Sequence, residues 1–427
     1  MCRLQQCLIR HSNNLPHAKL AIAGRSTSDT AGLEQAMIFP TEAAYHVYLQ
    51  DVKDFLWHEI DPLVPQIERD ELIPFDMLRP KLREHHLFDC LVPEAYGGLG
   101  LTTEQYAPVL KELAKVHGGL RAMLHVHNSS VHLLETGRAE QRQRYIPRMA
   151  TGDLLVCFGL TEPDSGSGLD SKSRAERQGD VYRLTGCKHL ITNAREADLF
   201  AVFCFTEDPS LGSKEFTVLL VERGMPGFTI ERMAPTMGCA GASHDLLRFD
   251  NVPVPVENVL GREGLGSAQL LAFLEISRVF IAVAALGTAE RALELAVAWA
   301  KQRITFGRPI AERQAVQGYL AEMATDIYAL RHIVLDALRK YDAGQRIPEE
   351  ASMCKLFGLE VVGRVTDKAL LVHGGLGYLK SSRIEMLYRD ARLNWLEEGT
   401  PTIHKLIIAR TLLQEEYATF GRGTELI

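Results

Sequence analysis

Residues 388–401 read YRDARLNWLEEGTP and join two stretches whose apolar residues recur at helical spacing. Thr400 and Pro401 have the residue types of an N-cap and a first helical position, so they predict the start of the last helix. Glu398 then lies just before that helix, on a loop that Gly399 makes flexible. A carboxylate in this position is either an ordinary surface side chain or a group with a chemical role.

Outward from this loop, the hydrophobic period divides the chain into three parts. Helical spacing prevails over residues 41–153, short β-like runs between turns prevail over 154–262, and helical spacing returns over 263–427. The clearest β-like runs are 181–184, 199–205, 216–221 and 246–249. We therefore predict a mostly helical α+β protein, with a helical N-terminal domain, a central β domain and a helical C-terminal domain. Two apolar stripes, 320–338 and 403–413, are predicted to pack in the core or between subunits.

The composition excludes several classes of function. The 47 Lys and Arg residues against 54 Asp and Glu give a net charge of −7, which argues against a nucleic-acid partner. The longest apolar runs, such as residues 280–286, fall short of the roughly 20 residues of a membrane span, so none is predicted. The 8 cysteines form no CxxC pair, which argues for a reducing compartment and against a cysteine zinc site. A metal site at His125, His127 and His132 is conceivable, but helix histidines are the favoured interpretation, and no metal is predicted.

Residues 1–40 are predicted to be a disordered tail or a targeting segment. The first 28 residues carry four basic side chains and no acidic one, a pattern found in mitochondrial presequences. The alternatives are a disordered tail, or a start codon assigned too early, with Met37 as the first residue. We expect a cytoplasmic protein, with the mitochondrial matrix as the alternative.

Three familiar nucleotide and hydrolase motifs are missing from the sequence. No GxGxxG follows a predicted strand, and there is neither a GxxxxGK[ST] loop nor a GxSxG nucleophile elbow. Five other segments carry polar or glycine-rich patterns: 157–167 (CFGLTEPDSGS), 186–193 (GCKHLITN), 301–310 (KQRITFGRPI) followed by Gln314, 372–378 (VHGGLGY) and 388–401. The first suits a polar cofactor edge, Arg303 suits a phosphate, and the glycines of the fourth allow close approach of a ligand or backbone. Taken singly, each segment says little, and an ordinary helix end or surface loop is the favoured interpretation for Arg303 and Glu398.

In their order and spacing, these segments resemble the acyl-CoA dehydrogenase family of flavoenzymes over about residues 41–415. Residues 92–101 are similar to the family's VPEEYGGLG stretch, 161–167 to its TEPxxGS signature, 303–314 to its RxTFG…Q segment and 388–400 to its YRDA…EGT ending. The resemblance implies three domains, the last a four-helix bundle, assembled as a homotetramer or dimer. It also implies FAD held without a dinucleotide-binding glycine loop, in agreement with the missing GxGxxG.

The resemblance also assigns roles by position. The β domain would line the flavin with Phe158, Leu160, Thr161, Gly166, Ser167, Leu190, Ile191 and Thr192. The FAD of a neighbouring subunit would be reached by Arg303, Phe306, Gln314, Leu371, Gly374 and Gly375, with Thr400 and Thr402 also at the cofactor. Ser167, Glu275, Arg278 and Gly399 would contact the acyl thioester. Glu398 matches the catalytic base, and Glu397 and Glu275 are the next candidates.

The implied reaction is the α,β-dehydrogenation of an acyl thioester, either acyl-CoA or an acyl carrier protein conjugate, to the trans-2-enoyl thioester. Glu398 would remove the α-proton, flavin N5 would accept the β-hydride, and an electron-transfer flavoprotein would be the electron acceptor. Burial should raise the pKa of Glu398, and we expect it to outweigh the opposing effect of the following helix N-terminus. The alternatives are a flavin oxidase or monooxygenase on the same fold, and a non-catalytic scaffold that has lost FAD.

Some residues depart from the family pattern. Leu190 stands where a tryptophan is common, Phe158 where a tyrosine is frequent, and Leu371 where a glutamine helps to hold FAD. Ala240 and His244 interrupt the usual GxRxSxT stretch. Pro401 and Thr402 replace a small residue followed by Gln or Asn. These changes concern cofactor affinity and the electron acceptor.

Overall fold

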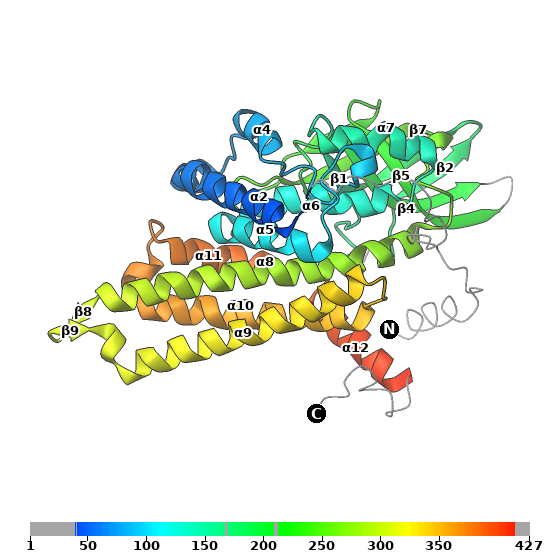
Figure 1. Ribbon diagram of the computed structural model, residues 1–427. Coiled ribbons are helices and arrows are strands. Elements are labelled where there is room, and N and C mark those ends of the chain that lie inside the picture. Colours follow the sequence, from blue (N-terminus) through cyan, green and yellow to red (C-terminus); the bar gives the residue numbers. More distant parts are fainter. Residues whose placement is uncertain (1–38, 40, 167–169, 209–211, 415–427) are drawn as a thin grey trace. The chain divides into compact units, whose positions relative to one another are not determined.

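The computed structural model describes residues 39, 41–166, 170–208 and 212–414 of the 427 in the sequence. The expected tail or targeting segment, residues 1–40, therefore lies almost wholly outside the described residues, and so does Ser167. The described chain begins with helices, continues with a sheet and ends with long helices, as the hydrophobic periods predict (Figure 1).

The first part is built of helices whose ends follow from local side-chain caps. Its α-helices are α2 (Glu42–Phe55), α3 (Val64–Asp70), α4 (Phe75–Glu84), α5 (Thr103–Val116), α6 (Gly118–Leu134) and α7 (Ala139–Ala150). Thr41 caps α2 by accepting from the Ala44 amide, and Thr102 and Gln105 form a capping box at the start of α5. His117 adopts an extended backbone between α5 and α6 and caps α6 with its ring, so the chain turns sharply at this residue.

The central part is a seven-stranded sheet with the order β1-β4-β2-β3-β7-β6, in which β5 pairs with β4. The strands are β1 (Val156–Gly159), β2 (Arg174–Gln178), β3 (Val181–Thr192), β4 (Leu199–Asp208), β5 (Ser213–Glu222), β6 (Phe228–Glu231) and β7 (His244–Pro255). All four predicted β-like runs lie within these strands. Alternate residues of β4 point to opposite sides: Leu199 and Phe203 join the core shared with the helices, whereas Phe200 and Val202 join a second core inside the β domain.

The last part consists of α8 (Gly266–Gln302), α9 (Gln314–Asp342), α10 (Pro348–His373), α11 (Arg383–Leu393) and α12 (Pro401–Gln414). A short hairpin of β8 (Ile304–Thr305) and β9 (Arg308–Pro309) joins α8 to α9, and Figure 1 shows it at the end of α8 that is remote from the seven-stranded sheet. The apolar stripe of α9 is largely buried, as predicted. The stripe of α12 is largely exposed in the single chain, so it does not belong to the core of this chain.

Helix α8 bears on the expectation that the chain has no membrane span. It is long and apolar enough, by length and composition, to cross a membrane, although no uninterrupted apolar run suggested this. In the structure, 83% of its most apolar window is buried inside the protein. A helix segment that is enclosed by other elements can be apolar on all sides, because none of its sides faces water. The apolar part of α8 is such a segment of a core helix.

Asp390 joins the three parts of the chain. Its two carboxylate oxygens accept hydrogen bonds from the Gly118 amide at 3.2 Å and from the Cys239 amide at 2.6 Å. The first amide begins α6, the second follows the β6 strand, and Asp390 itself lies on α11. A Cβ atom at Gly118 would lie 2.6 Å from a carboxylate oxygen of Asp390, so only glycine allows this approach.

The adjacent Arg389 strengthens this junction. Its guanidinium donates to Glu68 at the end of α3, to Glu385 on its own helix and to the carbonyl of Met237. Arg389 and Asp390, near the start of stretch 388–401, thus contact both other parts of the chain.

We predict that Asp390→Ala lowers the free energy of unfolding by about 3 kcal/mol, because it leaves two buried amides without an acceptor. The measurement is urea denaturation followed by circular dichroism. Asp367→Ala is the control, because Asp367 is an exposed aspartate in the middle of α10. A loss equal to that of the control would contradict the role of Asp390.

Candidate active site

Glu398 lies on the loop between α11 and α12 in a left-handed backbone conformation, with φ of 55°. One of its carboxylate oxygens, Oε2, is buried and has no hydrogen-bond partner among the described residues. The guanidinium of Arg278 on α8 donates to the backbone carbonyl of Glu398 at 3.4 Å. The side chain of Glu398 is therefore held close to a cation but keeps an oxygen available.

The pKa of Glu398 is raised above its ordinary value of 4.5. Burial is the largest cause, and the neighbouring carboxylate of Glu397 adds to it. Lys355, a hydrogen bond from Ser277 and Arg278 act in the opposite direction without cancelling the rise. The direction agrees with the expectation from the sequence that burial prevails over the helix N-terminus.

The two other candidate bases are already engaged. Both oxygens of Glu397 lie 3.3 Å from the buried guanidinium of Arg121, and Asn394 donates to Glu397 at 2.7 Å. Burial raises the pKa of Glu397, but Arg121 and Asn394 outweigh it, so the pKa is lowered overall. Glu275 forms an ion pair with Arg346 and accepts from the backbone amide of residue 347 at 2.6 Å. Of these three carboxylates, Glu398 is the one with an uncommitted oxygen.

Two predicted flavin-binding segments of the β domain lie side by side. The His189 amide donates to the Thr161 carbonyl at 3.0 Å, which joins segment 157–166 to segment 186–193. The register shift between Lys188 and Ile191 interrupts the pairing of β3 with β7, and Leu190 adopts φ of 56° there. Leu190 is consequently 50% exposed, whereas Ile191 is buried.

A buried ion pair supports this segment from behind. The Lys188 ammonium is fully buried and donates to Glu162 at 2.7 Å, to the Leu160 carbonyl at 3.0 Å and to Ser171. Glu162 also accepts from the backbone amides of Lys172 and Ser173. Burial raises the pKa of Glu162, but these hydrogen bonds and the Lys188 charge lower it to about 2.

The remaining predicted residues of the β domain are placed around these segments. Phe158 packs edge-on against Phe273 of α8 with ring centroids 4.9 Å apart. Leu160 is buried, Thr161 and Thr192 are partly buried, and Gly166 is exposed. Ser167 lies outside the described residues.

The residues predicted to reach a neighbouring subunit form a second group. Arg303, Phe306 and Gln314 lie at the hairpin end of α8 and the start of α9, and Leu371, Gly374 and Gly375 lie at the end of α10. The rings of Trp299 and His373 stack with centroids 5.4 Å apart and bring the two segments together. From Phe273 to Arg303, α8 rises about 45 Å at about 1.5 Å per residue, so this group is remote from Phe158 in the same chain.

Thr400 and Thr402 flank the start of α12 and are exposed beside the Glu398 loop, and Gly399 adopts φ of 102° within it. Gly399 contributes its carbonyl to the packing of the loop, because His404 on α12 donates to it at 3.0 Å.

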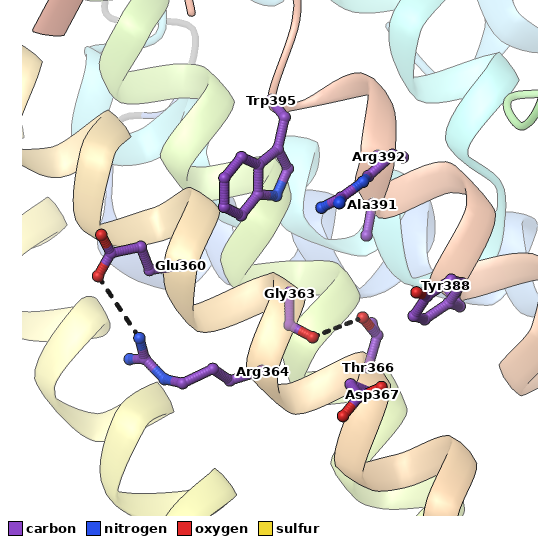
Figure 2. Close-up of a pocket in the computed structure, with 9 residues that line it drawn as sticks. All are labelled: Glu360, Gly363, Arg364, Thr366, Asp367, Tyr388, Ala391, Arg392 and Trp395. Carbon is purple, nitrogen blue, oxygen red and sulfur yellow. Dashed lines mark hydrogen bonds and ion pairs between the residues drawn. The ribbon is translucent and has the colours of Figure 1, made fainter. Parts of the chain in front are cut away.

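A cavity of about 360 Å³ opens between α10 and α11. Figure 2 shows its lining by Glu360, Gly363, Arg364, Thr366, Asp367, Tyr388, Ala391, Arg392 and Trp395. No residue predicted to bind cofactor or substrate is among them. Trp395 is one of the lining residues, and the guanidinium of Arg392 lies over its ring, 4.8 Å from the centroid.

Two of the family departures meet in a second, smaller cavity. Ala240 and His244 line a space of about 140 Å³ together with Glu68, Arg232 and Arg389. The cavity thus borders Arg389, which belongs to the junction between the three parts of the chain.

Sequence reasoning missed several buried polar residues around Glu398. Lys355, Arg121, Ser277 and His404 are buried polar residues that pack around the 394–399 loop. One signal in the sequence could have indicated Lys355. Its helical spacing with Ala351 and Val362 places a lysine on the buried face of a helix. Among the described residues, no group of three or more His, Cys, Asp or Glu side chains could hold a metal ion.

The three parts of the chain correspond to three known domains. The family description "Acyl-CoA dehydrogenase, N-terminal domain" matches residues 44–153, "middle domain" matches 157–252 and "C-terminal domain" matches 264–413. An acyl-CoA dehydrogenase of Bacillus subtilis (strain 168) is 39% identical over 365 residues, which cover 85% of this chain and 96% of that protein. The chain belongs to the acyl-CoA dehydrogenase family and is an oxidoreductase that acts on CH–CH bonds.

Solved structures agree with this assignment and confirm the predicted fold class. Butyryl-CoA dehydrogenase from Megasphaera elsdenii has a TM-score of 0.82 and 30% identity, covering 86% of this chain and 98% of the other. The prolyl acyl carrier protein oxidase AnaB also has a TM-score of 0.82 and 30% identity, covering 87% and 99%. An acyl-CoA dehydrogenase from Bacillus anthracis in complex with FAD has a TM-score of 0.80 and 30% identity, covering 88% and 67%.

FAD is the cofactor of this family, and the residues present fit it. A Cβ atom at Gly166, Gly374 or Gly375 would meet no atom of the described residues within 4 Å, so each backbone is open to a ligand. Leu190 and Phe306 offer exposed apolar faces, the latter 97% exposed. Arg303 is exposed and forms no ion pair with any described residue, which leaves its guanidinium available for phosphate.

We predict that Glu162→Gln destabilises the protein by about 3 kcal/mol at pH 7, because it leaves the Lys188 ammonium buried without its carboxylate. The folded pKa of Glu162 is lowered, so its contribution is fully present above the ordinary pKa of 4.5 and is lost as pH falls through about 2. Urea denaturation at pH 7 and at pH 3 should therefore give a smaller difference from wild type in acid. Glu176→Gln, at an exposed position of β2, is the control. A difference that does not depend on pH would contradict the assignment.

Proposed function

We propose that the protein catalyses the FAD-dependent α,β-dehydrogenation of an acyl thioester, with Glu398 as the base that removes the α-proton. One observation carries the proposal: Glu398 has a buried carboxylate oxygen without a partner in the described part of the chain, on a loop where the neighbouring carboxylate is neutralised by Arg121. The α-proton of a thioester is weakly acidic, so its removal needs a strengthened base held next to the α-carbon. Burial, followed by the Glu397 charge, strengthens Glu398 in this way.

The chain's own residues supply position and electrostatics. When bound, FAD supplies the acceptor for the β-hydride. Arg278 holds the backbone of the Glu398 loop, and Glu398 holds the α-proton once it is removed. A bound acyl chain would cover the part of Glu398 that is still accessible and would exclude water from it.

We also propose that the group formed by Arg303, Phe306, Gln314, Leu371, Gly374 and Gly375 completes the FAD site of a neighbouring copy in a dimer or tetramer. Its distance from the β domain along α8 and the exposure of Phe306 support this arrangement. An electron-transfer flavoprotein is the proposed electron acceptor.

Replacement of the base should abolish turnover and leave the cofactor bound. Glu398→Gln keeps the shape of the side chain but cannot accept a proton, so we expect a rate loss of about 100-fold or more with unchanged flavin content. The measurement is steady-state oxidation of acyl-CoA thioesters with an artificial electron acceptor. In wild type the rate should rise with pH through the raised pKa of Glu398, because only the carboxylate form is active. Glu84→Gln, exposed at the end of α4, is the control, and a Glu398→Gln rate above about a tenth of wild type would refute the assignment.

An acyl carrier protein oxidase is the second candidate, because AnaB matches the fold over nearly its whole length. An anaerobic panel of acyl-CoA and acyl carrier protein thioesters separates the two functions. We expect the flavin absorbance to bleach without oxygen, and an artificial acceptor to restore it faster than oxygen does. Rapid reoxidation by oxygen with peroxide formation would favour the oxidase. A purified protein that takes up no FAD would favour a non-catalytic scaffold.

A further inference from the structure

Lys355 is the one lysine of α10 whose ammonium lies against the Glu398 loop. Its side chain is fully buried, and Nζ donates to the backbone carbonyl of Glu397 and, at 2.5 Å, to that of Gly399. The two acceptors lie on either side of Glu398 in the sequence. The buried ammonium of Lys355 therefore links α10 to the backbone on both sides of Glu398, which is the proposed base.

The backbone at this point needs such a restraint. Glu398 is one of few non-glycine residues with positive φ among those described, and Gly399 follows it with φ of 102°. A left-handed conformation is unfavourable for a residue with a Cβ atom and persists only where surrounding contacts enforce it. The hydrogen bonds from Lys355 are such contacts, because they fix the directions of the carbonyls before and after Glu398.

We propose that Lys355 is a positioning residue for the base: its ammonium fixes the loop conformation that presents Glu398, and its positive charge favours the ionised carboxylate. The inference rests on the proposed role of Glu398. A buried cation that donates only to neutral carbonyls would be poorly compensated, whereas the adjacent carboxylates of Glu397 and Glu398 provide the opposite charge.

The charged groups around Glu398 come from every element packed against the loop. They are Arg278 and Glu275 on α8, Arg121 and His125 on α6, Lys355 on α10, Glu397 on the loop itself and His404 on α12. Arg121 is committed to Glu397 and Glu275 to Arg346. Burial lowers the pKa of His125 and of His404 to about 3, so both rings are neutral. Lys355 and Arg278 are therefore the cations that act directly on Glu398.

His404 provides a matched comparison within the same loop. It donates to the Gly399 carbonyl at 3.0 Å, as Lys355 does, but it carries no charge near neutral pH. Removal of the His404 side chain weakens the restraint on the loop and leaves the positive charge of Lys355 in place. Removal of the Lys355 side chain takes away both a restraint on the loop and the positive charge.

The experiment compares Lys355→Met, Lys355→Arg and His404→Met in the full-length, FAD-loaded protein. The pH dependence of kcat is measured with butyryl-CoA and ferrocenium as the acceptor. For Lys355→Met we expect the acidic limb to move up by about one pH unit, because loss of a cation raises the pKa of a nearby carboxylate. The rate at pH 7 should fall about tenfold and partly recover at higher pH. In Lys355→Arg the midpoint of the acidic limb should return to the wild-type pH. In His404→Met the rate should fall while this midpoint stays at the wild-type pH.

Equal losses at every pH for Lys355→Met, with an unmoved midpoint, would overturn the inference and reduce Lys355 to a structural role. Thermal unfolding and flavin content identify a variant that fails to fold, and Lys355→Gln, which keeps a donor without charge, then provides the same midpoint test. The Glu398→Gln variant is assayed in parallel. If it stays active, the proposed function fails; if it is inactive while Lys355→Met shows no shift, only the present inference fails.

Discussion

The carboxylate of Asp390 is the contact on which the arrangement of the three domains depends. It accepts a hydrogen bond from a backbone amide at the start of α6 and another from a backbone amide between β6 and β7. The helix that carries Asp390, α11, leads directly to the Glu398 loop. Because both amides are buried, no water can replace the carboxylate, and the three elements are fixed to one another. The loop that carries the proposed base therefore begins about one helical turn after the residue at which all three domains meet.

A second constraint is electrostatic and lies inside the helical core. Glu397, Glu398, Arg121, Arg278 and Lys355 gather in and around one loop, and each is buried or partly buried. Such charges are tolerated only when they compensate one another. Arg121 neutralises Glu397, so that Glu398 keeps a free oxygen, and Lys355 and Arg278 hold the backbone. The same pairing explains why two neighbouring glutamates differ in pKa direction, with Glu397 lowered and Glu398 raised.

Much of the fold was predictable from the sequence because it depends on local period and on short motifs. The four β-like runs lie within strands, and the α9 stripe is buried. Two features of the helices were less apparent from the sequence, for physical reasons. The most apolar window of α8 is 83% buried inside the protein, which no uninterrupted run revealed. The α12 stripe is largely exposed in the single chain, and its packing between subunits stays a prediction. The predicted site residues form two groups that lie far apart along α8. Hydrophobic periods and short sequence motifs carry no information on the distance between such groups.

The sequence by itself determined the class of fold, the family and the candidate base, since glycine placement, cap residues and hydrophobic spacing are written in consecutive residues. Only the tertiary structure decided which of the adjacent carboxylates Glu397 and Glu398 is neutralised. That choice depends on Arg121 and Lys355, which lie 276 and 42 residues away in the sequence from Glu397. Burial and long-range ion pairing set the pKa of each group, and both arise from packing between elements that no local pattern specifies.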